Sequence, residues 1–154
     1  MSSLISENLI SAEVSSDDRK AIMEAIAAIR ARLPFLVDLS NEERDLLPKM
    51  GEQTHSFVMK LLELAKQHPE LFPKEFNLAE FQKDVELYNN LFPLLNSLKQ
   101  LNQLVSDTLV AVGSDIYTEA LEAYTYAQSS GKAQGLDDIR AIMSRRFFQR
   151  NRTS

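Results

Sequence analysis

A helical period that runs without a break from residue 78 to residue 129 constrains this chain more than any other feature of its sequence. At 100° per residue, one stripe collects a long series of apolar side chains. The stripe consists of Leu87, Leu91, Leu94, Leu98, Leu101, Val105, Leu109, Val112, Ile116, Ala120, Ala123 and Ala127. Ile116 and Ala120 keep the phase of Leu109 and Val112 on the far side of Gly113. We therefore expect a continuous or gently bent helix here rather than a reversing turn.

This helix is predicted to be too long for a compact chain of this size. Pro93 should kink it, because proline removes one backbone hydrogen bond and clashes with the preceding turn. Residues 94–129 alone would span about 54 Å at 1.5 Å per residue, whereas a compact chain of this length has a radius of gyration near ~15 Å. The excess must bend at Gly113 or project into a partner, and the simplest partner is a second copy of the chain.

Most of the remaining chain is also predicted to be helical. Ser15 should begin a helix that carries Ile22, Ile26, Ile29 and Leu33 on one face and ends before Pro34. Ser40 and Glu43 form a capping box for a short helix over 41–47. A helix from near Lys49 to Gln67 and a final helix over 136–149 follow. Sustained alternation of apolar and polar residues is missing from the sequence, which predicts no strand.

These patterns predict an all-α protein, an antiparallel bundle of about four main helices of which one is long and Pro-kinked. The expected organisation is a flexible N-terminus over 1–14, a single helical-bundle domain over 15–149 and a basic C-terminal end over 150–154. The first 18 residues lack the basic region and apolar core of a secretory signal, and no apolar stretch approaches the ~20 residues of a transmembrane helix. We therefore expect a cytoplasmic protein with no transmembrane segment.

The charges are distributed unevenly along the chain. The formal net charge is −5, yet the last sixteen residues hold five arginines and no acid, namely Arg140, Arg145, Arg146, Arg150 and Arg152. The acidic remainder disfavours nucleic acid or a membrane surface as partner, because phosphate contacts need concentrated positive charge. The tail alone, through Arg145, Arg146, Arg150 and Arg152, has the composition of an anionic-surface binder. The apolar residues Leu136, Ile139, Met143 and Phe147 predict instead a helix that docks on the bundle.

Few residues have the pattern of a catalytic or metal site. The chain has no cysteine, which excludes disulfides, iron–sulfur clusters and thiolate zinc sites. Glu52 and His55 form a Glu-x-x-His motif of the kind found in di-iron bundles, but such a site needs a second motif, and Ala65 stands three residues before His68. Glu52 and His55 are thus the only weak metal candidates, and we predict no catalytic residue, no metal and no cofactor.

Two further features point to interactions between helices. Asn102 lies within the apolar stripe beside Leu98, Val105, Leu109 and Ile116, where a polar residue can fix register or oligomeric state. The alternative is a stripe-edge residue bonded to a neighbouring helix or to water. The tyrosines at the edges of the stripe can close the rim of a bundle core or line a ligand groove, and they are Tyr88, Tyr117, Tyr124 and Tyr126.

Several short strings resemble a group of small, uncharacterised bacterial helical proteins. They are Leu33-Pro34-Phe35-Leu36, Leu39-Ser40 with Glu42-Glu43-Arg44, Pro48-Lys49-Met50-Gly51, Phe57-Val58 and, more loosely, the leucine-rich helix as far as Val112-Gly113-Ser114. The resemblance implies a bacterial, cytosolic, all-helical protein and transfers no catalytic residue.

The sequence favours a non-enzymatic interaction or structural module that forms a homo-oligomer or binds another helical protein. One alternative is a bundle that binds a small ligand or a metal through His55, Glu52 and the tyrosines. The other alternative is an anionic-surface binder that acts through the arginine tail.

Overall fold

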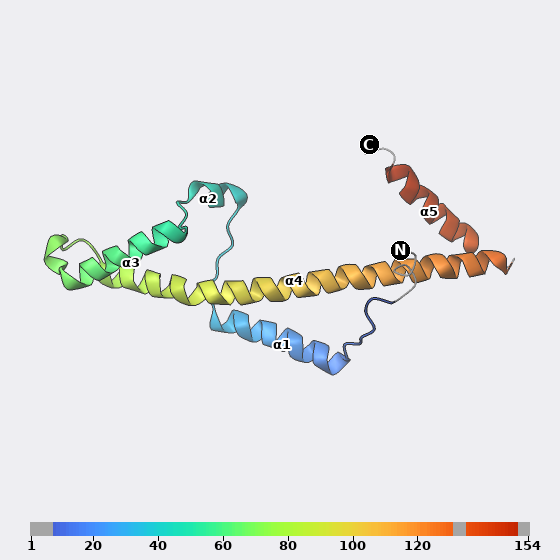
Figure 1. The fold of residues 1–154 in the computed structure, drawn as a ribbon, viewed down its shortest axis with the longest axis horizontal. Helices are drawn as coiled ribbons and strands as arrows, with labels where there is room; N and C mark the ends of the chain where they lie inside the picture. The colour runs from blue at the N-terminus through green and yellow to red at the C-terminus, as the bar shows by residue number, and fades with distance from the viewer. Residues whose placement is uncertain (1–7, 131–134, 151–154) are drawn as a thin grey trace. The chain divides into compact units, whose positions relative to one another are not determined.

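The chain is all-α. The computed structural model describes residues 8–130 and 135–150, with side chains described as far as Arg146. Of the described residues, 78 % are helical and none lies in a strand, which confirms the predicted class. The elements are α1 (Ser16–Arg32), α2 (Asn41–Leu46), α3 (Glu52–Gln67), the 3₁₀ helix η1 (Pro69–Leu71), α4 (Leu78–Ser129) and α5 (Leu136–Arg150) (Figure 1).

Local side-chain caps set the starts of these helices. The Ser15 hydroxyl accepts the N–H of Asp18 at 3.0 Å before α1. Ser40 and Glu43 form both bonds of the predicted capping box, at 2.8 and 3.1 Å. α3 begins at Glu52, a few residues later than predicted, because Gly51 is its N-cap residue. The predicted caps of α1 and α2 are therefore confirmed, whereas the start of α3 differs because glycine has no capping side chain.

α4 is a single helix of 52 residues. Its first turn is capped by Asn77, whose side-chain oxygen accepts the N–H of Glu80 at 3.0 Å. The helix contains Pro93 and continues through Gly113. The predicted continuity across Gly113 is confirmed.

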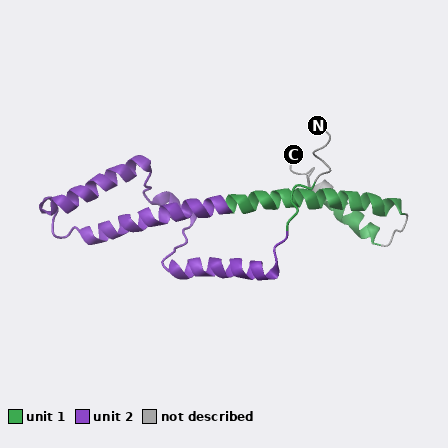
Figure 2. Ribbon diagram, turned by 60° about the horizontal axis from the view of Figure 1, so that its bottom comes forward, with its two compact units in different colours: residues 1–12, 102–154 green, residues 13–101 purple. Residues whose placement is uncertain are grey.

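The chain forms two compact units, and each is described by itself (Figure 2). In residues 13–101, α3 and the first part of α4 lie side by side, joined by η1. Leu62 and Ala65 of α3 and Val85 of α4 are buried there. The end of α1 also meets α4, since Ile29, Arg32 and Leu33 line a hollow of about 300 Å³ with Leu94, Ser97 and Leu98.

The second unit consists of residues 1–12 and 102–154. Leu136, at the start of α5, is buried. The guanidinium carbon of Arg146 lies 5.5 Å from the centre of the Tyr117 ring, which is a cation–π contact between α5 and α4. The backbone N–H groups of Leu9 and Ile10 each donate to the carboxylate of Asp115, both at 2.9 Å.

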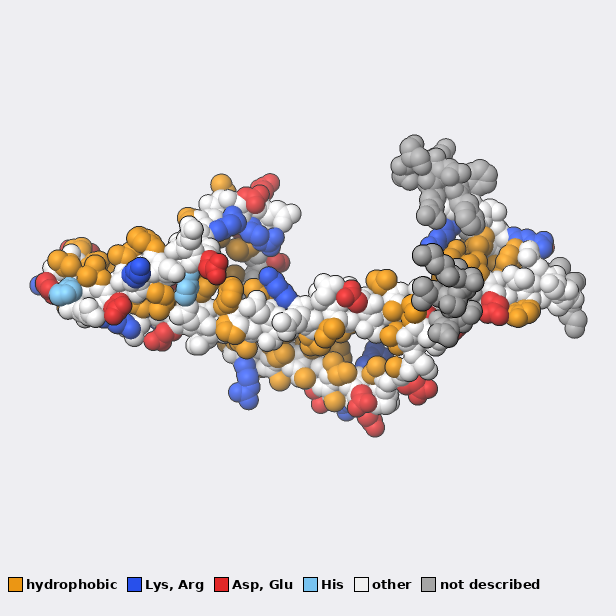
Figure 3. All heavy atoms as spheres, viewed as in Figure 1, with side chains coloured by type: hydrophobic (Ala, Val, Ile, Leu, Met, Phe, Trp, Pro, Cys, Tyr) orange, Lys and Arg blue, Asp and Glu red, His pale blue; other side chains and the backbone are white. Residues whose placement is uncertain are grey.

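The buried apolar core of the described residues is small, and apolar side chains lie at the surface of both units (Figure 3). Leu62, Ala65, Val85 and Leu136 are the buried hydrophobic residues among those described. Many leucines, isoleucines and valines of α1 and α4 are exposed. The antiparallel packing of four main helices stays a prediction.

Candidate functional site

A hollow of about 480 Å³ lies between the start of α3 and the first part of α4, within residues 13–101. We call it the α3–α4 hollow. Its lining residues are Met50, Gly51, Glu52, His55, Tyr88, Asn89, Phe92 and Pro93. The volume lies in the range of ~300–1,000 Å³ that is usual for small-molecule sites. The two halves of the hollow come from helices that the α3–η1–α4 turn brings alongside each other.

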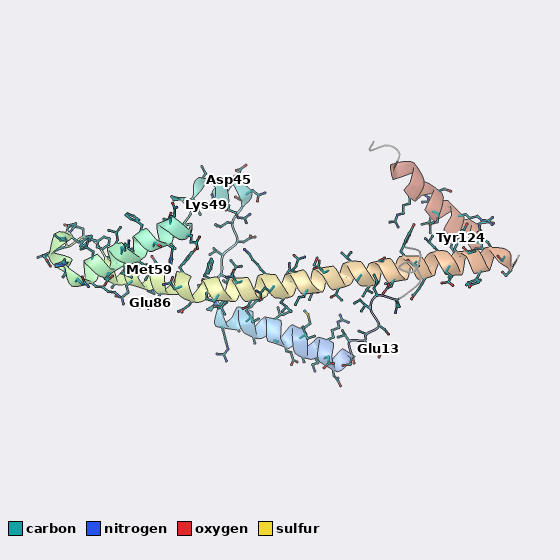
Figure 4. All side chains as sticks on the ribbon, in the orientation of Figure 1. Glu13, Asp45, Lys49, Met59, Glu86 and Tyr124 are labelled. Atoms are coloured by element: carbon teal, nitrogen blue, oxygen red, sulfur yellow. The ribbon has the colours of Figure 1, made fainter. Side chains whose placement is uncertain are left out.

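His55 and Asn89 form the polar contact between the two walls. The distance from His55 Nε2 to Asn89 Oδ1 is 2.8 Å. Asn89 Nδ2 lies 3.8 Å from the sulfur of Met59, the next α3 residue along this face (Figure 4). Because an amide oxygen only accepts, His55 Nε2 carries the proton in this bond. In the tautomer that carries its one proton on Nε2, the other ring nitrogen, Nδ1, is an acceptor.

Three rings follow one another along one side of the hollow. The ring centres of His55 and Tyr88 lie 5.9 Å apart and are tilted by 32°. Those of Tyr88 and Phe92 also lie 5.9 Å apart and are inclined by 24°. Tyr88 and Phe92 are four residues apart on α4, the spacing that places side chains next to each other on a helix surface. The rings therefore give the hollow an aromatic wall.

Glu52 is the first residue of α3 and lines the same hollow as His55. The structure thus brings the two metal candidates together with Tyr88. Among the residues described, no group of three or more His, Asp or Glu side chains is placed to hold a metal ion. The pair lies beside aromatic rings and an amide, groups that are rarely ligands of a metal ion.

The predicted interaction residues of α4 are all exposed. The exposed fractions of Leu98, Val105, Leu109 and Ile116 are 45, 53, 68 and 59 %. Asn102 is exposed as well. Together with Leu87, Leu91, Leu94, Leu101 and Val112 they form one line along α4, which we call the α4 seam.

The described arginines of the C-terminal helix differ in their surroundings. Arg146 lies over Tyr117, Arg140 Nη1 lies 3.9 Å from Asp137 Oδ1, and Arg145 is exposed. The side chain of Arg150 and all of Arg152 lie outside the described residues. Of the remaining tyrosines, the Tyr124 hydroxyl accepts from Gln128 at 2.9 Å, and the Tyr126 hydroxyl donates to Glu122 at 3.2 Å.

Sequence reasoning missed two elements of these sites. Phe92, Pro93 and Met50 join the hollow because of the register between α3 and α4, which no local pattern reveals. Asp115 accepts two consecutive backbone N–H groups from residues more than one hundred positions earlier. A lone aspartate beside the apolar stripe was the only local sign of that contact.

The sequence matches no protein family, and no curated protein or solved structure is similar to it at a significant level. In the part of the chain that the structure describes, every helix is too short or too polar to cross a membrane.

Proposed function

We propose that this chain is a non-enzymatic interaction module that associates with a second copy of itself through the α4 seam. The observation that carries the proposal is the exposure of Leu98, Val105, Leu109 and Ile116 on one continuous helix. Burying apolar surface of this kind contributes ~25 cal/mol per Å². The end of α1 reaches this row at Leu94 and Leu98. The exposed remainder of the row is a source of association free energy that the single chain leaves unused.

The scarcity of charge around α4 supports the same proposal. Between residues 87 and 114, Lys99 and Asp107 are the only charged side chains, and the other polar residues are Asn, Gln, Ser, Thr and Tyr. A neutral polar group can be buried once it is hydrogen-bonded, whereas a charge needs a partner of opposite sign. This composition suits a helix that another protein surface covers.

The spacing of the seam favours an antiparallel pair of identical helices. The seam residues are placed symmetrically about the point between Leu101 and Asn102. In an antiparallel two-fold pair this symmetry sets apolar residues opposite each other. The opposing pairs are Leu98 with Val105, Leu94 with Leu109, Leu91 with Val112, and Leu87 with Ile116.

The centre of this arrangement holds Leu101 and Asn102 of both copies. The Asn102 amide both donates and accepts, so two copies near the axis can bond to each other and fix the register. A parallel pair would instead align the two helix dipoles, which costs electrostatic energy. Such a pair sets the α4 helices of two copies antiparallel, while the end of each α1 stays against its own Leu94 and Leu98.

Matched variants test the seam in the full chain. Leu109→Glu places a charge in the seam, while Leu104→Glu makes the same change at an equally exposed leucine about 140° away around the helix. Native mass spectrometry over a dilution series should show a dimer for the wild type and for Leu104→Glu, and at least tenfold weaker association for Leu109→Glu. A monomeric wild type, or equal weakening by both changes, would overturn the proposal.

The register can be tested separately because the chain has no cysteine. Leu94→Cys and Leu109→Cys should be cross-linked to each other by a short bismaleimide in a co-refolded mixture. Neither should be cross-linked to its own copy, because two copies of residue 109 would lie about 22 Å apart along an antiparallel pair. Efficient self-linkage of Leu109→Cys would show a parallel pair and refute the register.

A further inference from the structure

We propose that the α3–α4 hollow binds a small organic cation that carries an aromatic ring. The inference goes beyond self-association and does not depend on it, since every lining residue lies within residues 13–101. On α4, Tyr88, Asn89 and Phe92 lie about 80–180° around the helix from the seam residue Leu98. A second copy on the seam and a ligand in the hollow therefore occupy different sides of this helix.

The volume of the hollow and its aromatic wall favour a ligand that contains an aromatic ring. The hollow holds about 480 Å³, enough for a one-ring molecule with a short side chain. Phe92 lines the hollow and is 49 % exposed although it contacts Tyr88, so part of its surface is accessible to a ligand. Offset stacking of a ligand ring on Phe92 would extend the existing succession of His55, Tyr88 and Phe92.

The charge of the residues that line the hollow favours a positively charged ligand. Glu52 contributes a carboxylate, and no lysine or arginine lines the hollow. The carboxylate also offsets the partial positive charge at the start of α3, where Gly51 provides no side-chain cap. Aromatic faces attract a cation held within ~6 Å of the ring centre.

The hydrogen-bonding groups agree with an ammonium ion. Acceptors for its three N–H donors are the Glu52 carboxylate, Nδ1 of the His55 tautomer that donates to Asn89, and the hydroxyl of Tyr88, all on residues that line the hollow. His55 Nε2 is already used by Asn89, which holds the imidazole in place. A carboxylate ligand would meet Glu52 and an acceptor nitrogen, so the same lining disfavours an anion.

The test uses four probes on the ¹⁵N-labelled full chain. Tyramine has the ring and the ammonium group, tyrosol has the same ring with a neutral hydroxyl, 4-hydroxyphenylacetate has the ring with a negative charge, and butylamine has the cation without a ring. Tyramine should give saturable amide shifts that centre on Gly51, Glu52, His55, Asn89 and Phe92. Tyrosol should bind about threefold to tenfold more weakly, and the other two probes should not saturate.

Matched variants assign the roles of Glu52 and Phe92. Glu52→Gln should weaken tyramine by about threefold to tenfold and leave tyrosol unchanged, while Glu63→Gln, on the same helix but outside the hollow, should change neither. Phe92→Ala should weaken tyramine and tyrosol alike. Leu109→Glu should bind tyramine as the wild type does, so a failure of self-association and a failure of this site give different results.

Three outcomes would overturn the inference. Tighter binding of 4-hydroxyphenylacetate than of tyramine would show an anion site at the start of α3. Tyramine shifts that do not saturate, or that centre elsewhere, would show that the hollow is not a binding site. An unchanged tyramine affinity in Glu52→Gln would remove the carboxylate from recognition.

Discussion

Replacing Asp115 by alanine should release the segment around residues 9 and 10 from α4. The Asp115 carboxylate accepts the N–H of Leu9 on one oxygen and that of Ile10 on the other, both at 2.9 Å. Asp115 is half-buried and Ile10 is half-buried, while Leu9 is exposed. The alanine variant removes both acceptors at once, and the two amides are then free to exchange with solvent.

The size of the effect follows from the type of bond. A hydrogen bond to a charged group contributes ~1.5–3 kcal/mol. Because solvent reaches this site, we take the two bonds together to be worth about 1.5–3 kcal/mol rather than twice that range. At about 1.4 kcal/mol per factor of ten, the exchange rates of both amides should rise by about 10- to 150-fold.

Hydrogen exchange followed by NMR measures these two amides directly. Asp115→Asn keeps one carbonyl oxygen, so it should keep one of the two amides protected. Asp107→Ala is the matched control, because Asp107 lies on the same helix and bonds only to Gln103 within α4 among the contacts described. Unchanged exchange of Leu9 and Ile10 in Asp115→Ala, or the same increase in Asp107→Ala, would refute the reasoning.

Two further predictions concern the helices themselves. The backbone N–H and the hydroxyl of Ser40 hold the pKa of Glu43 below its usual value, so the capping box stabilises α2 fully above the usual carboxyl pKa and loses its effect as the pH falls through the lowered pKa. An NMR titration should show the Glu43 pKa rising part of the way back in Ser40→Ala, and a pKa that does not move would contradict the assignment. Gly113→Ala should stabilise the chain by ~0.5–1 kcal/mol in urea unfolding, because an added methyl group meets no atom within 4 Å. A loss of stability there would instead show that another helix approaches the backbone closely.

The helices were predictable because short-range interactions determine them. Ser40 and Glu43 satisfy each other's backbone donors within four residues, and the bond can be read from the residue types. The period across Gly113 is likewise a property of neighbouring turns. The late start of α3 was missed because a glycine N-cap leaves no recognisable side-chain pattern at Gly51.

For the sites, the sequence predicted candidate residues but not the tertiary contacts around them. The Glu-x-x-His spacing singled out Glu52 and His55 as a pair, but the spacing does not tell what the two side chains face. That depends on the register of the α3–α4 pair, which places Tyr88 and Asn89 beside His55. The contact of Asp115 with Leu9 and Ile10 depends on tertiary structure over more than one hundred residues, and no periodicity records it.

The low charge of α4 between residues 87 and 114 bears on both proposals. On the seam side, neutral residues surround leucines, which suits a protein partner that excludes water from a long strip. On the side of Tyr88, Asn89 and Phe92, the helix also offers aromatic and amide groups without charge, and the only carboxylate of the hollow comes from α3. Charge selectivity in the hollow therefore rests on Glu52, while association rests on residues such as Leu109. A single substitution on one side of α4 should leave the function of the other side intact.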